Sequence, residues 1–344
     1  MKEGYVRKSI NEICDKASSN IAQNKIKDID GDYPVYGASG YVQNIDFYHR
    51  DTDYIGIVKD GSGVGRVNIY PAYSSLLGTM QYIIPKEGYL LGYVAYALKG
   101  LNLSSFASGA AIPHIYFKDY GKCKIDVPPL NEQERIVAEL DLLSGIIEKK
   151  KEQLKAYDQL AQSIFYTMFG DPITNEKGWE SKQLGEVYKL KSGDGLSAKQ
   201  FIEGQYPVYG GNGISGYHNS FNMNGDYIII GRVGAYCGNV RYVSGKFWLT
   251  DNAFQLIYDE KEQHPVFVKH LLTFLDLHQY ANHAAQPVIS NITLKEVKVL
   301  FPPLSLQQEF AEKVEAIEWQ KALIKQSIKE TEDLFNSRMD YYFY

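Results

Sequence analysis

The string Tyr-Pro-Val-Tyr-Gly occurs twice in this chain, at residues 33–37 and 206–210, and this repetition limits the folds that the chain can adopt. The two copies lie 173 positions apart, and at the same offset Tyr54–Val67 aligns with Tyr227–Val240. The tripeptide Pro-Pro-Leu also recurs, now 174 positions apart. Such a period is much longer than the roughly 20–50 residues of a solenoid repeat. The sequence therefore predicts one domain that has been duplicated.

Each copy carries the same local signals for strands and tight turns. β-rich runs at 54–59 and 227–233 lead into glycine-rich turns, which predicts hairpins. Tyr-Pro-Val-Tyr-Gly predicts a strand that enters a glycine-rich loop, a backbone able to approach a ligand closely. One surface helix is expected in each copy, at 90–98 and at 265–277. We therefore expect mixed α/β units with many short strands.

The segments that follow Pro128-Pro129 and Pro302-Pro303 predict long helices. Asn131 with Glu134, and Ser305 with Gln308, have the spacing of a capping box. Apolar residues then alternate at steps of four and three, which is typical of a coiled-coil seam. In the first segment the seam consists of Ile136, Leu140, Leu143, Ile147, Lys150, Leu154, Tyr157, Ala161, Ile164 and Met168. In the second it consists of Phe310, Val314, Ile317, Lys321, Ile324, Ile328, Thr331 and Phe335.

The first helix is predicted to end at Phe-Gly-Asp-Pro, because Gly170 can adopt the left-handed conformation and Pro172 cannot continue a helix. The alternative is that each helix packs only on its own domain. That arrangement favours a third apolar position in every heptad. The pattern leaves the register of the seam open, so Lys150 and Lys321 are either neighbours or far apart.

Charge separates the long helices from the remainder of the chain. We expect recognition units at 1–129 and 172–303, and spacer helices at 130–171 and 304–344. The helical segments each carry a net charge of −3, whereas the units carry +1 and 0. Any affinity of the units for nucleic acid must therefore come from local patches or from a basic partner.

Cysteine and histidine spacing gives no sign of a metal site. Cys14, Cys123 and Cys237 show no zinc-type spacing, and we interpret them as reduced thiols of a cytoplasmic protein without a signal peptide. Four histidines lie close in sequence but at spacings that match no zinc motif: His264, His270, His278 and His283.

Catalytic motifs are not recognisable. Gly61–Gly65 lacks the ending of a phosphate-binding loop and predicts a tight hairpin instead. Asp141 with Glu148-Lys149-Lys150 superficially matches a nuclease set, but we expect these residues to lie along one helix as solvated charges. We find no methyltransferase motif either, and therefore expect a non-catalytic chain.

Over nearly its whole length the chain resembles the specificity subunit of type I restriction–modification systems. The resemblance rests on the paired Pro-Val-Tyr-Gly loops, the Gly-x-x-x-Gly hairpins, and Trp248–Ala253 followed by Ala-Ala-Gln-Pro. It also rests on Pro-Pro-Leu-Asn-Glu-Gln-Glu-Arg opening a long helix that Phe-Gly-Asp-Pro closes. The order of these elements, occurring twice, makes the resemblance specific. In the second copy Leu306-Gln307-Gln308 departs from the family pattern, and in the first copy Ile112 stands where the second has Gln286.

This resemblance implies two target-recognition domains, each reading one half of a split, asymmetric DNA site. The helices would pair antiparallel as a spacer, with an internal pseudo-two-fold axis, and would dock two methyltransferase subunits and, through them, the restriction subunits. The chain itself would need no cofactor. S-adenosylmethionine, ATP and magnesium, together with adenine-N6 methylation and DNA cleavage, would belong to the partners.

Residues that read bases need side chains able to make paired hydrogen bonds, chiefly Arg, Lys, Asn and Gln. Lys59 and Arg232 occupy the same repeat position, so we expect them to make a shared phosphate or base contact. The candidates in the first unit are Ser39, Tyr41, Lys59, Ser62, Arg66 and Asn68. Those in the second are Asn212, Ser215, Tyr217, Arg232, Tyr236, Asn239 and Arg241.

Three other functions stay open on the sequence. A specificity subunit could act with a methyltransferase alone, without a nuclease partner. An independent DNA-modifying enzyme would need catalytic groups that the sequence does not reveal. A pure coiled-coil scaffold would not need two elaborate loop domains.

Overall fold

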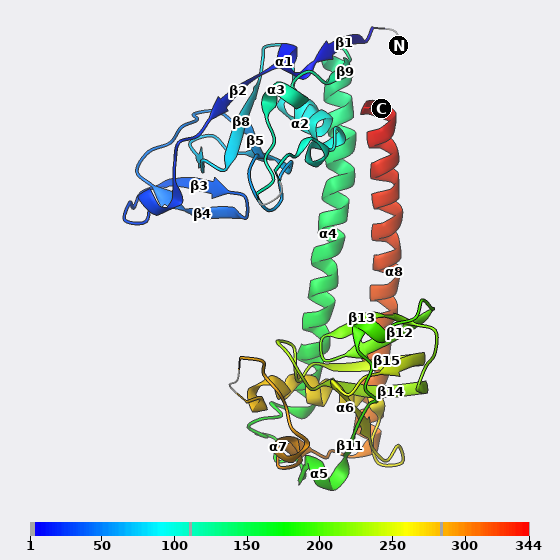
Figure 1. Ribbon diagram of the computed structural model, residues 1–344. Coiled ribbons are helices and arrows are strands. Elements are labelled where there is room, and N and C mark those ends of the chain that lie inside the picture. Colours follow the sequence, from blue (N-terminus) through cyan, green and yellow to red (C-terminus); the bar gives the residue numbers. More distant parts are fainter. Residues whose placement is uncertain (1–3, 110–111, 283–284, 344) are drawn as a thin grey trace. The chain divides into compact units, whose positions relative to one another are not determined.

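A computed structural model describes residues 4–109, 112–282 and 285–343, and its contacts divide the chain into two units. Unit 1 comprises Met1–Lys151 together with Lys325–Tyr344, and unit 2 comprises Glu152–Ile324. The long helices α4 (Leu130–Phe169) and α8 (Leu304–Phe343) each contribute to both units (Figure 1). Unit 1 is therefore built from both ends of the sequence.

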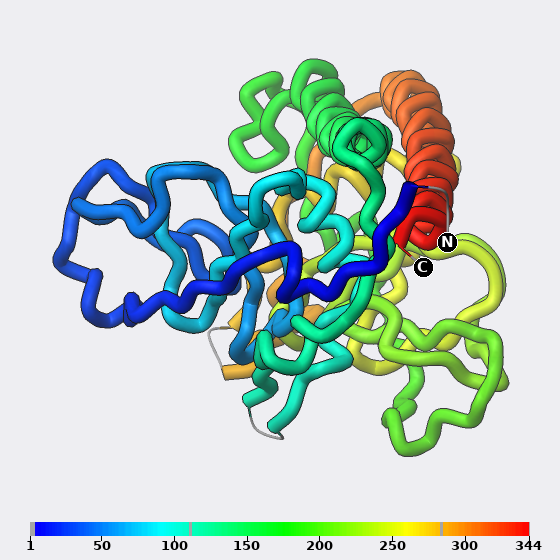
Figure 2. The backbone as a smooth tube through the Cα atoms, turned by 90° about the horizontal axis from the view of Figure 1, so that it is seen from above, coloured from blue at the N-terminus to red at the C-terminus, as the bar shows by residue number. Residues whose placement is uncertain are grey.

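Unit 1 contains short strands around the surface helix α2 (Leu91–Gly100), which forms where the sequence predicts it. Its strands are β1 (Val6–Ser9), β2 (Cys14–Ser18), β3 (Tyr33–Gly37), β4 (Gly40–Ile45), β5 (Tyr54–Val58), β6 (Val67–Tyr70), β7 (Ser75–Leu76), β8 (Met80–Pro85) and β9 (Lys124–Val127). Its other short helices are α1 (Ile10–Ile13), η1 (Gln23–Lys25), η2 (Leu103–Phe106) and α3 (Phe117–Tyr120). β1 and the end of α8 lie beside the start of α4 (Figures 1 and 2).

Unit 2 repeats this pattern around α6 (Pro265–Phe274), the second surface helix that the sequence predicts. Its strands are β10 (Ser181–Gln183), β11 (Lys189–Ser192), β12 (Tyr206–Gly210), β13 (Gly213–His218), β14 (Met223–Gly231), β15 (Val240–Leu249), β16 (Ala253–Ile257) and β17 (Lys298–Leu300). Its other short helices are α5 (Leu184–Val187), η3 (Ala198–Gln200), η4 (Leu277–Tyr280) and α7 (Asn291–Lys295). The predicted mixed α/β class is confirmed in both units.

Strand pairing shows that the two units are copies of one topology. The order β2-β8-β5-β6 in unit 1 corresponds to β11-β16-β14-β15 in unit 2. The repeated Tyr-Pro-Val-Tyr-Gly strands, β3 and β12, each form a hairpin with the next strand, and each hairpin has an irregularity between its Val and second Tyr. β15 continues across to pair with β12, whereas in unit 1 the same path is interrupted between β6 and β7. Pro71 lacks an N–H group, and Tyr73 has a φ of 55°, so the strand cannot continue there.

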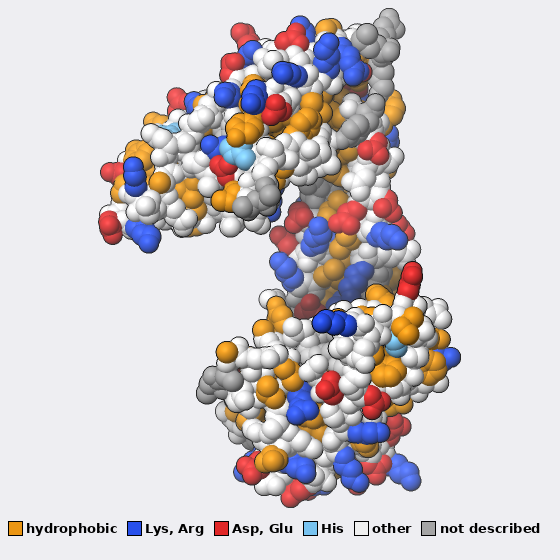
Figure 3. All heavy atoms as spheres, in the orientation of Figure 1, with side chains coloured by type: hydrophobic (Ala, Val, Ile, Leu, Met, Phe, Trp, Pro, Cys, Tyr) orange, Lys and Arg blue, Asp and Glu red, His pale blue; other side chains and the backbone are white. Residues whose placement is uncertain are grey.

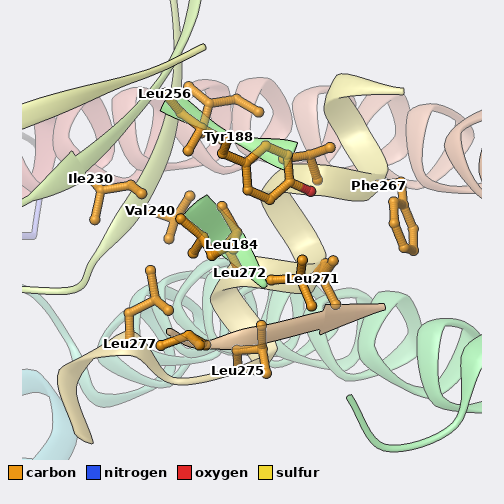
Figure 4. Packing of buried hydrophobic residues seen from close by; sticks show 14 of the residues in the cluster. Leu184, Tyr188, Ile230, Val240, Leu256, Phe267, Leu271, Leu272, Leu275 and Leu277 are labelled. Atoms are coloured by element: carbon orange, nitrogen blue, oxygen red, sulfur yellow. The ribbon is translucent and has the colours of Figure 1, made fainter. Parts of the chain in front are cut away.

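The core of unit 2 lies between its sheet, α6 and both long helices. Figure 4 shows Leu184 and Tyr188 facing side chains from the strands and from α6. Phe165 and Phe169 of α4 are fully buried against Phe267 of α6. These aromatic contacts anchor the end of α4 in the domain core.

Inside each unit the two long helices run antiparallel, as the resemblance implies. In unit 1, Arg135 donates a hydrogen bond to Tyr342 (3.2 Å), and Lys150 donates one to the Ser327 hydroxyl (2.5 Å). In unit 2, the Lys321 ammonium lies 2.7 Å from the Asp158 carboxylate. Residue numbers therefore rise along α4 as they fall along α8. On the visible face of the helices, hydrophobic side chains lie between acidic and basic ones (Figure 3).

One detail of the predicted helices is wrong, and the structure adds another. At the end of α4, Ile164 and Met168 of the predicted seam are partly buried in the core of unit 2, and Phe165 and Phe169 are fully buried because the last turns also pack against α6. The proposed caps Asn131 and Ser305 lie inside the first turn, since the helices already begin at Leu130 and Leu304. The end at Gly170 is confirmed, with a φ of 76° and an N–H that donates to the Tyr166 carbonyl.

Buried glutamines fasten the start of each long helix to its domain. The Gln133 side chain accepts from the Leu90 N–H (3.0 Å) and donates to the Pro128 carbonyl (3.0 Å). At the equivalent place in unit 2, Gln307 accepts from the His264 N–H (2.9 Å) and donates to the Pro302 carbonyl (2.8 Å). Both glutamines thus join the surface helix of a unit to its spacer helix.

Replacing either glutamine with leucine should destabilise the protein by about 1–3 kcal/mol, because buried backbone groups lose their partners. Urea unfolding of Gln133→Leu and Gln307→Leu measures this loss. The exposed neighbour Gln308, changed to leucine, is the control and should leave the free energy of unfolding nearly unchanged. Equal stability of all three variants would contradict the role of the glutamines.

His270 makes the stability of unit 2 depend on pH. It is 8% exposed, and its Nδ1 donates to the Val266 carbonyl at 2.7 Å. Burial, together with the nearby Lys269 ammonium, lowers the pKa of His270 from 6.5 to about 4. The folded state therefore holds a neutral ring at pH values where the unfolded chain already binds a proton. The resulting stability is fully present above pH 6.5 and is lost as the pH falls toward 4.

We expect the wild type to lose up to about 3 kcal/mol more than His270→Gln between these pH values, since glutamine does not titrate in this range. Thermal or urea unfolding at several pH values measures the difference. Parallel stability curves for the two proteins would show that His270 is not the group responsible.

Candidate nucleic-acid interface

A glycine-rich hairpin packs against a short helix in each unit. Gly65 and Gly238 have φ values of 86° and 87°, which favour glycine. A Cβ at Gly65 would lie 2.5 Å from the Ser104 backbone N, and one at Gly238 would lie 2.5 Å from that of His278. These glycines are therefore needed for both the turn and the close approach of the hairpin to η2 or η4.

In unit 1 an arginine joins this hairpin to the loop between β3 and β4. Arg66 Nη1 donates to the Ala38 carbonyl at 3.0 Å. Ser39 follows Ala38 at the exposed turn, and the Tyr41 side chain is 62% exposed at the start of β4. The structure thus brings together Ser39, Tyr41 and Arg66, and Tyr41 also lines one hollow with the predicted residue Asn68.

The remaining candidates of unit 1 have different surroundings. Lys59 Nζ lies 3.9 Å from the carboxylate of Asp60, which also pairs with His114 Nδ1. Ser62 is exposed at the tip of the hairpin. Asn68 is exposed on β6, with its amide nitrogen 3.5 Å from the Tyr70 hydroxyl. The charge of Lys59 is therefore partly compensated within the protein.

A groove that we name the unit 1 groove lies beside these residues and has a volume of about 710 Å³. It is bounded by residues 20–23, 37–42 and 77–79. The Thr79 carbonyl at its edge accepts from the Lys59 N–H at 3.0 Å, and the Ala38 carbonyl is held by Arg66. The groove is therefore continuous with both the loop and the hairpin.

Unit 2 repeats the arginine contact from a different sequence position. Arg241 Nη2 donates to the Asn212 carbonyl at 3.4 Å, which brings these two candidates together. Ser215 is exposed on β13, although its hydroxyl donates to the Val208 carbonyl at 3.2 Å. Tyr217 on the same strand is 56% exposed.

The hairpin of unit 2 carries the other three candidates. Tyr236 is 63% exposed, and Asn239 is exposed close to it. The Arg232 guanidinium lies 5.3 Å from the centre of the Phe254 ring and donates to the Asp251 carbonyl at 3.4 Å. Within the described residues, Arg232 Nε is buried without a hydrogen-bond partner. Lys59 and Arg232 thus have different surroundings. The phosphate or base contact expected of both residues stays a prediction.

The two units exchange arginine and asparagine around an equivalent valine. Unit 1 has Arg66-Val67-Asn68, whereas unit 2 has Asn239-Val240-Arg241. Either arginine reaches the carbonyl of the neighbouring loop. This relation could have been noticed in the sequence by comparing the two copies residue by residue, but only the contacts show its structural meaning.

Cys237 and His278 come together in unit 2, although their spacing in the sequence gave no sign of it. The Cys237 Sγ lies 3.4 Å from His278 Nδ1, and the same nitrogen donates to the Cys237 carbonyl at 3.0 Å. Because Nδ1 carries the proton, it cannot act as a base toward the thiol. Burial also raises the pKa of Cys237. The pair lacks the features of an activated nucleophile.

The nuclease-like set does not converge in unit 1. Asp141 accepts from the Tyr96 hydroxyl at 2.6 Å, while Lys150 bonds to Ser327. Among the described residues, no three His, Cys, Asp or Glu side chains are placed to hold a metal ion, and His283 lies outside those residues. Ala110, Ala111 and Ala284 of the repeated Ala-Ala segments also lie outside them.

No helix in the described part of the chain has the length and apolar character needed to span a membrane. Burial raises the pKa of the Cys14 thiol to about 12, and all three cysteines are free. They are not joined as a disulfide framework.

The chain is similar to known proteins along nearly its whole length. It is 30% identical to the EcoprrI type I restriction enzyme specificity subunit of Escherichia coli, over 64% of this chain and 57% of that protein. It is 28% identical to the MjaIX specificity subunit of Methanocaldococcus jannaschii, over 34% of this chain and 32% of that protein. The aligned part is thus only about half or a third of these relatives.

A crystal structure of a type I restriction–modification system S subunit from M. genitalium has the same fold. The TM-score is 0.65 at 18% sequence identity, covering 99% of this chain and 96% of the other. A family model described as type I restriction modification DNA specificity domain matches residues 2–156 and 176–333. The chain belongs to the type I restriction–modification DNA specificity family.

Proposed function

We propose that this chain reads a two-part, asymmetric sequence in double-stranded DNA, one part with each unit. The observation that carries the proposal is the repeated contact between loop and hairpin. Arg66 binds the Ala38 carbonyl in unit 1, and Arg241 binds the Asn212 carbonyl in unit 2. In unit 1 this contact joins the hairpin to the loop that carries Ser39 and Tyr41, and Tyr41 and Asn68 line one hollow; in unit 2 it joins Arg241 to the loop that carries Asn212. These are the groups that recognise base edges in the major groove.

The exchange of arginine and asparagine supports an asymmetric site. Arginine favours guanine and asparagine favours adenine. Because the two residues stand in opposite order around Val67 and Val240, the units present different donor and acceptor patterns. Two units with the same fold would then read different base sequences.

Partner subunits would dock on the long helices. Within unit 2, Leu160, Trp319 and Leu323 are 45%, 61% and 43% exposed; within unit 1, Leu142 and Leu334 are 65% and 45% exposed. Leu160 and Leu334 are 174 positions apart and therefore equivalent in the repeat. Apolar side chains on acidic helices suit a protein partner with a basic, partly apolar surface.

We propose that two methyltransferase subunits take these places and that restriction subunits join through them. S-adenosylmethionine, ATP and magnesium would bind to those partners, which would methylate adenine N6 and cleave DNA in the cytoplasm. This chain would contribute recognition and no catalytic group.

The test is single-molecule sequencing of N6-methyladenine in cells that express this chain with a methyltransferase of its system. A two-part asymmetric motif that disappears when this chain is deleted is the expected result. Methylation at an undivided site, or methylation indifferent to the deletion, would contradict the proposal.

Arginine variants make the same test specific to each unit. Arg66→Ala should degrade one part of the motif and Arg241→Ala the other, because each removes a cation and a loop contact from one unit only. The expected loss of preference is about 5- to 150-fold. Arg7, which is exposed and paired with Asp126, provides the control Arg7→Ala, and the motif should remain intact. Loss of the same part by both variants would show that the units do not divide the site.

A further inference from the structure

Among the residues that the structure describes, those that line the unit 1 groove include no charged side chain. Among its described lining residues, apolar and backbone surface comes from Ile21, Ala22, Val42, Leu77 and the glycines, and polar side chains come from Asn20, Gln23, Ser39, Tyr41 and Thr79. Phosphate binding gains most of its affinity from lysine and arginine, because each phosphate carries a negative charge, and the described lining of the groove offers neither. Neutral amides and hydroxyls beside apolar surface suit the edge of a base pair instead.

Asn20 and Gln23 form one wall of this groove with their side chains available for a ligand. Both residues are exposed. Within the described chain, neither side chain makes a hydrogen bond to another residue. An amide offers one acceptor and two donors, and can therefore pair with adenine N6 and N7 together. Ala22 and Val42 give the groove apolar surface that can contact the methyl group of thymine.

The equivalent place in unit 2 is organised differently. Ser18 of β2 corresponds to Ser192 of β11, so that Asn20 corresponds to Asp194. The Asp194 carboxylate accepts from the Asn222 amide at 2.9 Å, and its carbonyl accepts from the Trp248 indole at 3.2 Å. Asp194 of unit 2 thus makes hydrogen bonds within the protein, whereas the side chain of Asn20, its counterpart in unit 1, is free to bind a ligand.

We propose that the amides of Asn20 and Gln23 in the unit 1 groove read an A·T base pair in the part of the DNA site recognised by unit 1. The inference rests on the proposed function and deepens it, because it names two further specificity residues and the base pair they recognise. Ser39 and Thr79 complete the polar lining. Arg66 fixes the opposite wall through its hydrogen bond to the Ala38 carbonyl.

The test uses the assembled methyltransferase complex and DNA that carries the wild-type motif. For each position of the motif, the base preference is the ratio of methylation at the cognate site to methylation at a site substituted only at that position. The double variant Asn20→Ala/Gln23→Ala should lose about 5- to 150-fold of its preference at one A·T position in one part of the motif. All positions of the other part should keep their ratios.

A charge-bearing double variant gives a second readout. In Asn20→Asp/Gln23→Glu the side chains are similar in size but only accept hydrogen bonds, so the preference at that position should shift from A·T toward cytosine, whose amino group donates. Asn24→Ala is the matched control. Asn24 is an exposed amide in η1 but does not line the groove, and its loss should leave the motif unchanged.

The inference would be overturned if both double variants kept the wild-type motif. It would also be overturned if a variant that melts like the wild type lost base preference equally at every position. If an alanine variant fails to fold, the Asp/Glu variant decides by whether the base preference shifts. Absence of any two-part motif with the wild-type chain would instead overturn the proposed function. The failures of the two proposals are therefore distinguishable.

Discussion

Burial of the long helices against each other and against the domain cores is the interaction on which each unit depends. In unit 1, Ile136 and Leu140 of α4 share a core with Met339 and Tyr342 of α8. In unit 2, Phe165 and Phe169 share one with Phe310 and Val314. The helix α4 follows the first copy in the sequence, and its second part belongs to unit 2. The helix α8 follows the second copy, and its second part belongs to unit 1. Neither copy contains all of its own core.

This exchange of helices explains how the duplicated fold can be retained while the proposed recognition surfaces diverge. Several residues that are identical in the two copies stabilise the fold. Gln133 and Gln307 bond the long helices to the surface helices, and Gly65 and Gly238 allow the hairpins to pack closely against η2 and η4. Several residues that differ between the copies are exposed, among them Asn20 and its counterpart Asp194. Changing an exposed loop side chain leaves the apolar contacts of the core intact. Divergence of the exposed loops is thus compatible with a constant fold.

Much of the fold could be predicted from the repeat and from helical periodicity, because both depend on local patterns of apolar residues. The helix caps could not, since Pro129 and Pro303 supply backbone carbonyls that a search for side-chain caps overlooks. The full burial of Phe165 beside the seam residue Ile164 was equally hidden, because it depends on contacts with α6. The interruption after β6 has one local signal in the sequence, Pro71, whose missing N–H cannot join a strand ladder.

The candidate site was predicted only where the two copies share a motif. The motifs shared by the two copies mark the loops and hairpins in the sequence. They do not reveal the hydrogen bonds that join Arg66 to Ala38 and Arg241 to Asn212. Asn20 and Gln23 were missed because they precede the motif by many residues and are brought to it by long-range contacts, among them the pairing of β2 with β8 and the packing of Ile21 against Val35. Side chains brought together by strand pairing leave no local signal in a single sequence.

We propose that each unit reads its own part of the DNA site and that both units share the two long helices. The most direct test uses a chimera in which the loops of unit 2 between β11 and β16 are replaced by those of unit 1 between β2 and β8. The DNA motif methylated with this chimera is then determined by sequencing. We expect both parts of the motif to carry the sequence read by unit 1. Retention of the original second part by this folded, active chimera would contradict it.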